Sequence, residues 1–318
     1  YMGQLLVVAL FIIFSFCVSA SPKDNNLRVL YLNLHNGMWA DQGNNYDSFV
    51  AWVQEQEPDI CIWSEAQSIY KDGTDKALEP GNRYLVENWG ILAARYGHKY
   101  WYVGGHRDNY PQVITSNHPI ENIKRIIGVQ PDSIVSHGAG WARINFKGYI
   151  INLVTVHLWP QAYAFNVKDR DASRAEHGGD KYRLMEMEYI CKNTIKTLKN
   201  AEEELWLMAG DFNSRSSRDN WFYKYPPDDT RFLVHNYIMQ NTPYVDIIAE
   251  KYPDGFKTTT YGKSRIDFIY CTSPLYNRII CTDVLSDEFT KPVRDEKKLS
   301  NFYHPSDHLP IIVEFDMQ

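Results

Sequence analysis

Short apolar runs recur along most of this chain and constrain its fold more than any other feature. Their length is typical of strands, and they fall at residues 27–34, 60–63, 112–116, 141–146, 149–158, 204–209, 266–272 and 309–315. Apolar residues at helical spacing occur between some of these runs, at 46–57 and 182–198. Strands that alternate with a few helices predict a layered α/β fold in which buried strands appear as continuous apolar stretches.

The composition fits one globular domain. The 318 residues are 44% apolar and 23% charged, and we find no tandem repeat, low-complexity tract or linker past the N-terminus, so we predict a single domain over residues 25–318. The formal net charge is −6, which excludes a general basic field for nucleic acid or anionic lipid. A bound metal ion could still supply positive charge at a local phosphate site.

The N-terminal residues 1–20 are expected to be a signal peptide. An apolar run at 4–20 ends in Val18-Ser19-Ala20, close to the small-residue pattern that signal peptidase requires. The alternative is an N-terminal membrane anchor, but the run is at the short limit for spanning a bilayer. We therefore expect export, to the outside of the cell or to the periplasm.

The cysteines do not predict a metal site. Four follow the expected leader, at Cys61, Cys191, Cys271 and Cys281, and no pair has the spacing of a zinc site. One disulfide among the four is possible in an exported protein, although the sequence cannot pair them.

Polar residues with catalytic potential stand at or near the ends of these apolar runs. Rigid strand ends are the places that hold such groups in one geometry. The candidates are Asn33, Glu65, His157, Asp211 with Asn213, Asp267, and Asp307 with His308 in the sequence Ser306-Asp307-His308. Because residues two apart in a strand face the same way, we expect Asp211 and Asn213 to point together into one pocket.

Each candidate also has a structural explanation. Asn33 could be a turn residue, Glu65 a cap, His157 a core histidine, Asp211 the start of an Asx-turn, and Ser306-Asp307-His308 a strand cap. Asp267 is harder to explain in this way, because a carboxylate between Ile266 and Phe268 needs a partner to be buried. Arg265 and His308 are its candidate partners.

The order and spacing of these motifs resemble the endonuclease/exonuclease/phosphatase superfamily, the deoxyribonuclease I-like metal-dependent phosphoesterases. Gly210-Asp211-Phe212-Asn213 and Ser306-Asp307-His308-Leu309-Pro310 carry most of the resemblance, which extends from Leu27 to Phe315. It implies a four-layer α/β/β/α sandwich of two packed mixed sheets, with the site at one edge of both sheets.

The resemblance also implies roles for the individual residues. Glu65 is expected to be the main Mg²⁺ or Mn²⁺ ligand, with Asn33 and Asp307 near the ion, because hard cations prefer oxygen ligands. Asp211 would accept a proton from the attacking water, and Asn213 would orient that water or the phosphate. His308, oriented by Asp267, would hydrogen-bond the phosphate. His157 would steady a phosphate oxygen or help to protonate the leaving group.

The substrate is less constrained. The predicted partner is a phosphoester, which could be nucleic acid, phospholipid or a small phosphodiester, and no stable protein partner is predicted. Asn117 stands where many members of the superfamily have arginine, and with Arg265 it is the candidate substrate contact. The alternatives are a sphingomyelinase-type lipid phosphodiesterase, an inositol-phosphate phosphatase, or an inactive binding module that keeps the fold. The polar stretch at 161–181 is expected to be a surface loop near the site.

Overall fold

A computed structural model describes residues 25–38, 45–66, 86–105, 110–162, 178–294, 297 and 303–318. The expected signal peptide at 1–20 lies outside the described residues, and so does most of the expected loop at 161–181. Among the described residues, no helix combines the length and the apolar character that a membrane-spanning segment needs.

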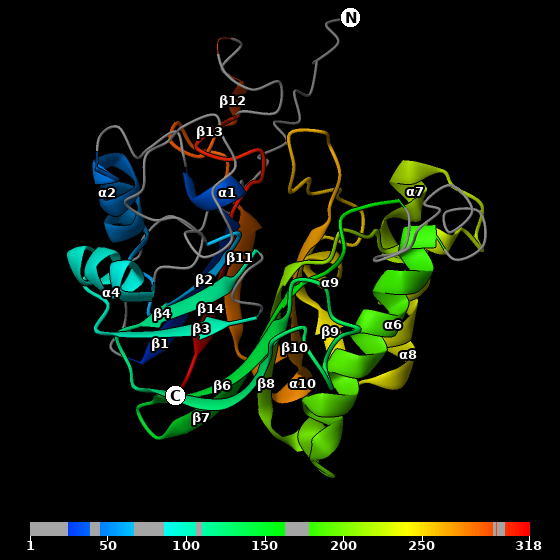
Figure 1. Ribbon diagram of the computed structural model, residues 1–318, viewed down its shortest axis with the longest axis horizontal. Coiled ribbons are helices and arrows are strands. Elements are labelled where there is room, and N and C mark those ends of the chain that lie inside the picture. The colour runs from blue at the N-terminus through cyan, green and yellow to red at the C-terminus, as the bar shows by residue number, and fades with distance from the viewer. Residues whose placement is uncertain are drawn as a thin grey trace, which may run out of the picture.

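Two six-stranded mixed sheets form the centre of the molecule (Figure 1). The first has the order β11-β14-β1-β2-β4-β3. Its strands are β1 (Asn26–Asn33), β2 (Ile60–Ser64), β3 (Tyr100–Gly104), β4 (Gln112–Ser116), β11 (Ile279–Val284) and β14 (Ile311–Asp316). The second has the order β5-β6-β7-β8-β10-β9. Its strands are β5 (Ile120–Ile126), β6 (Ala139–Phe146), β7 (Tyr149–His157), β8 (Leu205–Asp211), β9 (Tyr244–Asp246) and β10 (Asp267–Thr272).

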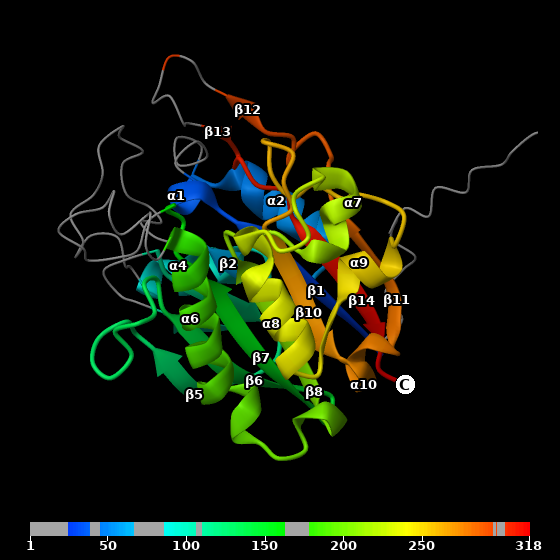
Figure 2. The same cartoon turned by 90° about the vertical axis from the view of Figure 1, so that its right-hand side faces the viewer.

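Helices cover the outer face of each sheet, which gives four layers. Figure 1 shows α2 (Asp47–Gln56) and α4 (Val86–Arg95) outside the first sheet, and Figure 2 shows α6 (Gly178–Asn193) and α8 (Leu233–Asn241) over the second. The shorter elements are α1 (His35–Met38), α7 (Asn220–Tyr223), α9 (Ile247–Lys251), α10 (Ser273–Tyr276), η2 (Ile195–Thr197), η3 (Ala201–Glu203), η4 (Ser217–Asp219), η5 (Thr230–Phe232), β12 (Val293–Arg294) and β13 (Tyr303–His304). The predicted α/β/β/α sandwich is therefore confirmed.

Three apolar clusters hold the layers together. One lies between the sheets and includes Val29, Ile62 and Leu207. A second packs α2 and α4 on the first sheet, and a third packs α6 and α8 on the second. This arrangement explains why so many strands are apolar along their whole length: each central strand is covered on both faces.

The predicted elements agree with the structure apart from a few boundaries. All eight apolar runs form strands, and the two helical segments become α2 and α6. Helix α6 begins at Gly178, so the end of the expected loop at 161–181 is helical, and a separate η2 follows Asn193. Of the four later cysteines, Cys61, Cys191 and Cys271 are free and buried, so none of these three pairs with another or with Cys281.

Candidate active site

Strand directions bring the candidate residues to one edge of both sheets. Strands β1 and β2 are parallel, so Asn33 ends β1 beside Ser64, and Glu65 follows directly. Strands β7 and β8 are also parallel, with His157 opposite Asp211. Strand β10 runs antiparallel to β8, which places its first residue, Asp267, opposite Asp211 on the other side. His157, Asp211 and Asp267 therefore form one row across three neighbouring strands, where facing side chains come within contact distance.

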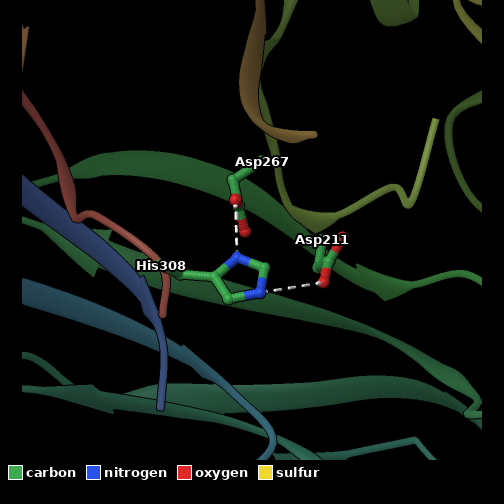
Figure 3. A group of neighbouring side chains, drawn as sticks. All are labelled: Asp211, Asp267 and His308. Carbon is green, nitrogen blue, oxygen red and sulfur yellow. Dashed lines mark hydrogen bonds and ion pairs between the residues drawn. The ribbon is translucent and has the colours of Figure 1, made fainter. Parts of the chain in front are cut away.

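His308 joins this row from the other sheet. It precedes β14, and its side chain lies between two carboxylates (Figure 3). Its Nδ1 is 2.8 Å from Asp267 Oδ2, and its Nε2 is 3.9 Å from Asp211 Oδ2. A bridge from His308 to Thr260 and a hydrogen bond from the His308 backbone N–H to Ser306 Oγ, 3.0 Å long, fix the backbone. The expected pairing of Asp267 with His308 is present.

The Asp211 carboxylate lies near the imidazoles of His157 and His308 and the side-chain amide of Asn33. Its Oδ2 lies 3.1 Å from Asn33 Nδ2 and 3.8 Å from His157 Nε2. Its Oδ1 accepts a hydrogen bond of 2.9 Å from the backbone N–H of Asn213. The Asx-type hydrogen bond is thus formed by one carboxylate oxygen, while the other oxygen faces the site.

Asn213 reaches the site in a different way from the one expected. Strand β8 ends at Asp211, so the alternation of a strand does not extend to Asn213, whose backbone is left-handed with φ 48°. Its Nδ2 donates to the carbonyl of Leu158 at 3.0 Å. The reasoning from strand alternation is wrong, although Asn213 still lies beside Asp211.

Glu65 and Asn33 are held together by unusual backbone. Glu65 has φ 51°, and every residue of α1 has positive φ, so this short element is a left-handed turn. The turn directs the backbone N–H of Asn36 to Glu65 Oε2 at 2.8 Å, and Asn33 Nδ2 lies 3.3 Å from Glu65 Oε1. Left-handed backbone at non-glycine residues is costly and is concentrated at functional sites.

Burial and charge determine the protonation of the site. Burial alone would lower the pKa of His308, but the Asp267 carboxylate and the other acids raise it well above its ordinary value. Burial and the charge of Asp267 raise the pKa of Asp211 to about 8. Burial lowers the pKa of His157, which keeps that imidazole neutral. These shifts favour a charged His308 and a neutral His157, and they make Asp211 a weaker acid than an ordinary aspartate.

Two predicted substrate contacts lie away from this group. Asn117 follows β4, which runs antiparallel to β2, so it sits beside Asp59 at the opposite end of the first sheet. Arg265 is buried and binds Asp219 through Nε at 2.7 Å and Asp246 through both terminal nitrogens at 2.8 Å. Neither position supports a contact with a phosphate bound beside Asp211, and the proposed pairing of Arg265 with Asp267 is not formed.

Tyr31 completes the site, and the sequence reasoning did not identify it. Its hydroxyl donates to Asp267 Oδ1 at 2.8 Å, and burial with the charges of Asp267 and Asp211 raises its pKa well above the ordinary value. The hydroxyl therefore remains a donor. A signal was available: Tyr31 stands two residues before Asn33 on the same strand, and thus on the same face. Ser306 also contributes, by donating to the carbonyl of Asn33 at 2.7 Å.

Comparison with a family model identifies the family of this chain. Residues 30–308 match the model of the Endonuclease/Exonuclease/phosphatase family. A search of curated proteins finds no match.

Solved structures share the fold at low identity. An AP endonuclease from Archaeoglobus fulgidus is 20% identical with a TM-score of 0.60, covering 91% of this chain and 99% of that one. Humanized D. rerio TDP2 is 14% identical with a TM-score of 0.57, covering 92% and 99%. A mannosyl-6-phosphatase from Bacteroides thetaiotaomicron is 15% identical with a TM-score of 0.52, covering 90% and 98%. With the family match over most of its length, the chain belongs to the endonuclease/exonuclease/phosphatase family.

Proposed function

We propose that this protein is an exported, divalent-metal-dependent phosphodiesterase that uses water as the nucleophile. Family membership supports a phosphoester hydrolase of the nuclease or phosphatase kind. The observation that carries the proposal is the row of His157, Asp211 and Asp267 with His308 placed between the two acids. In this arrangement Asp211 can act as a base, His308 is an oriented imidazolium, and His157 is a neutral imidazole.

The charge of the site argues for a bound cation. Glu65, Asp211, Asp267 and Asp307 bring four carboxyl groups together, and His308 is the cationic side chain among them. A phosphate would be repelled from such a cluster unless a metal ion offset the negative charge. Four acids in a site for an anionic substrate therefore favour metal-assisted chemistry.

The donor set fits Mg²⁺ or Mn²⁺. Asp307 Oδ1 is buried without a hydrogen-bond partner among the described residues, 3.8 Å from His308 Nε2 and 3.9 Å from His35 Nδ1. With the Glu65 carboxylate it offers the oxygen ligands that these ions prefer, and Asn33 adds an amide oxygen that also accepts from the backbone N–H of His35 at 2.9 Å. Asp211, Asp267 and His308 also place ligand atoms within 4.8 Å of one another. We assign the ion to Glu65, Asn33 and Asp307. In the alternative set of Asp211, Asp267 and His308, the last two residues are already hydrogen-bonded to each other.

The chain's own residues supply the remaining chemistry. When bound, the ion would neutralise charge on the phosphate and on the leaving oxygen. Asp211, as a carboxylate, accepts the proton of the attacking water. The positive charge of His308 favours this ionised form of Asp211. The cationic His308 donates Nε2–H to a phosphate oxygen, while Asp267 holds its ring. The neutral His157 donates a hydrogen bond to a second oxygen.

Activity on a panel of substrates tests this function. The panel comprises plasmid DNA, RNA, sphingomyelin, inositol phosphates and bis-p-nitrophenyl phosphate, each assayed with Mg²⁺ and with EDTA. We expect Mg²⁺-dependent hydrolysis of at least one diester and loss of activity in EDTA. Hydrolysis of monoesters alone would exclude a phosphodiesterase, and no hydrolysis of any substrate would favour an inactive binding module.

Asp211→Asn tests the proposed base. The amide oxygen can keep the hydrogen bond from Asn213, so the fold should persist, but the substituted side chain cannot accept a proton. We expect kcat to fall at least ~10²-fold, the low end for a lost general base. Asp254→Asn, at an exposed position, is the matched control and should leave kcat unchanged. Normal turnover by Asp211→Asn would show that Asp211 is not the base and that its role is limited to the Asx-type hydrogen bond with Asn213.

Export rests on the sequence of the leader. An apolar run that ends in Val18-Ser19-Ala20 supports cleavage after Ala20. The test is N-terminal sequencing of the protein secreted by a host that expresses the complete gene. We expect the mature chain to begin at Ser21, and a membrane-bound product that retains residues 1–20 would favour the anchor instead.

A further inference from the structure

Glu186 is a buried carboxylate on the outer helix α6, and both of its oxygens are used. The residue is 0% exposed. Oε1 accepts hydrogen bonds from the backbone N–H and the hydroxyl of Ser136, at 2.8 Å and 2.6 Å. Oε2 accepts a bond of 2.9 Å from the backbone N–H of Trp159. One side chain thus connects two loops that are distant from each other in sequence.

These two loops carry His137, whose ring packs against His157, and Trp159, whose ring packs against His137. Ser136 is followed by His137, and Trp159 comes two residues after His157. The His137 ring lies 4.6 Å from the His157 ring at 33° and 6.0 Å from the Trp159 ring at 29°. Tyr110 meets both imidazoles edge-on, at 4.9 Å from His137 and 6.0 Å from His157. The face of the His157 ring is therefore covered by His137, whose position depends on the loop that Glu186 holds.

A carboxylate is a costly way to connect two loops. Its charged form is penalised in a buried place, and within the described part of the chain three accepted hydrogen bonds and the nearby Arg183 offset that penalty. Burial accordingly raises the pKa of Glu186 to about 7. Arg183, one turn earlier on α6, donates to the carbonyl of Gln161 at 3.0 Å and so ties the chain beyond Trp159 to the same helix. Helix α6 thus anchors both loops through two ionisable side chains.

We propose that Glu186 is a positioning residue for His157, holding the Ser136–His137 and Trp159 segments so that His137 packs on the His157 ring and keeps its Nε2 toward Asp211. The inference rests on the proposed role of His157 in hydrolysis, but its spectroscopic test does not require any activity. The hydrogen bonds of Glu186 go to Ser136 and Trp159 and not to Asp211, so it acts through the loops.

Glu186→Gln is the primary test, because an amide has the same shape but only one accepting oxygen. Either Ser136 or Trp159 then faces an N–H group in place of an acceptor. We expect kcat to fall by about 10- to 100-fold with little change in KM, as for a small misplacement of a catalytic group. The matched control is Glu188→Gln, an exposed glutamate on the same helix, which should change neither value.

A double-mutant cycle separates positioning from general destabilisation. In a His157→Gln background the ring to be positioned is gone, so Glu186→Gln should cause no further loss of kcat. An equal loss in both backgrounds would overturn the proposal, because the effect would then not pass through His157.

Histidine NMR provides a measurement that is independent of catalysis. With ¹³Cε1-labelled histidine, the His157 signal is identified by its absence from the spectrum of His157→Gln. Glu186→Gln should shift the His157 and His137 signals and leave that of His98 in place, since His98 is held elsewhere by Thr115 and Pro58. Ser136→Ala, which removes only the hydroxyl contact, should shift them less and in the same direction. Unchanged signals in either folded variant would refute the proposal, even if the wild type proves to hydrolyse nothing in the panel.

Discussion

At the scale of single residues, Asp211 and Asp267 each bind a protein donor with one carboxylate oxygen and face the imidazole of His308 with the other. Asp267 accepts from Tyr31 with Oδ1 and meets His308 with Oδ2. Asp211 divides its oxygens in the same way between Asn213 and the site. Fixing one oxygen removes rotational freedom from the other, so the reactive atoms are positioned before substrate binds.

Asp267→Asn should uncouple His308 from this arrangement. An amide can accept from His308 or from Tyr31, but its N–H₂ group then opposes the other donor, and the charge that favours the imidazolium is lost. We expect kcat to fall by ~10²- to 10⁴-fold, measured on any substrate that the wild type cleaves. Tyr31→Phe keeps the carboxylate and should cost much less. If the folded Asp267→Asn protein turned over normally, Asp267 would have no orienting role.

At the scale of elements, strand direction decides which predictions succeed. His157, Asp211 and Asp267 were found from sequence because each stands at one end of an apolar run, and the pairing of β7, β8 and β10 aligns those ends. Asn117 also stands at the end of an apolar run, but β4 runs the other way relative to β2. Apolar patterns show where a strand ends and do not show its direction, and Asn117, chosen because many members of the superfamily have arginine there, lies at the opposite edge.

Sequence reasoning missed contacts that join distant parts of the chain or that involve unexpected partners. Glu186 on helix α6 binds Ser136 and Trp159, which are 50 and 27 residues away in the sequence, and no local pattern marks that contact. Arg265 was expected near Asp267, but the loop before β10 turns its side chain to Asp219 and Asp246. Two carboxylates around one guanidinium satisfy its donors better than a position beside the cationic His308 would.

Helix α8 contributes a histidine that should make stability depend on pH. His235 is fully buried, with Nδ1 2.6 Å from the Tyr270 hydroxyl and Nε2 3.4 Å from the carbonyl of Ser214, and burial lowers its pKa to about 3. The unfolded chain binds a proton on this ring near pH 6.5, whereas the native state excludes it. The contribution of His235 to the free energy of unfolding should therefore be complete above pH 6.5. As the pH falls from 6.5 toward 3, this contribution should decrease by about 1.4 kcal/mol per pH unit.

Urea unfolding of the wild type and His235→Gln at several pH values measures this contribution. At pH 8 the variant should be less stable, because it lacks the packing and hydrogen bonds of the ring. Below pH 6 the difference should shrink, since only the wild type loses stability through His235. A difference that stayed constant from pH 8 to pH 4 would show that the ring is not held neutral.

At the scale of the whole molecule, the site exists only when the two sheets are packed together. His157, Asp211 and Asp267 come from the second sheet, while Asn33 and Glu65 come from the first and Asp307 and His308 from the segment before β14. The apolar layer between the sheets, with Tyr31 at its edge, sets the separation of the two groups. A cation held by Glu65, Asn33 and Asp307 would bind only this packed state, since the unfolded chain does not bring the three residues together.

Mg²⁺ should therefore stabilise the folded protein, and Glu65 should be required for the effect. A ligand that binds only the native state raises the free energy of unfolding by about 2.7 kcal/mol at a hundred times its dissociation constant. Thermal unfolding of the wild type should move to higher temperature as Mg²⁺ is added, and EDTA should reverse the shift. Glu65→Gln keeps the volume of the side chain but removes its charge, so it should lose most of the shift and bind Mg²⁺ more weakly in calorimetry. Glu202→Gln, at an exposed position, should respond like the wild type, and NaCl at the same ionic strength should not reproduce the effect. If folded Glu65→Gln retained the wild-type affinity for Mg²⁺, the ion would be held by other residues, with Asp211, Asp267 and His308 as the next set to vary.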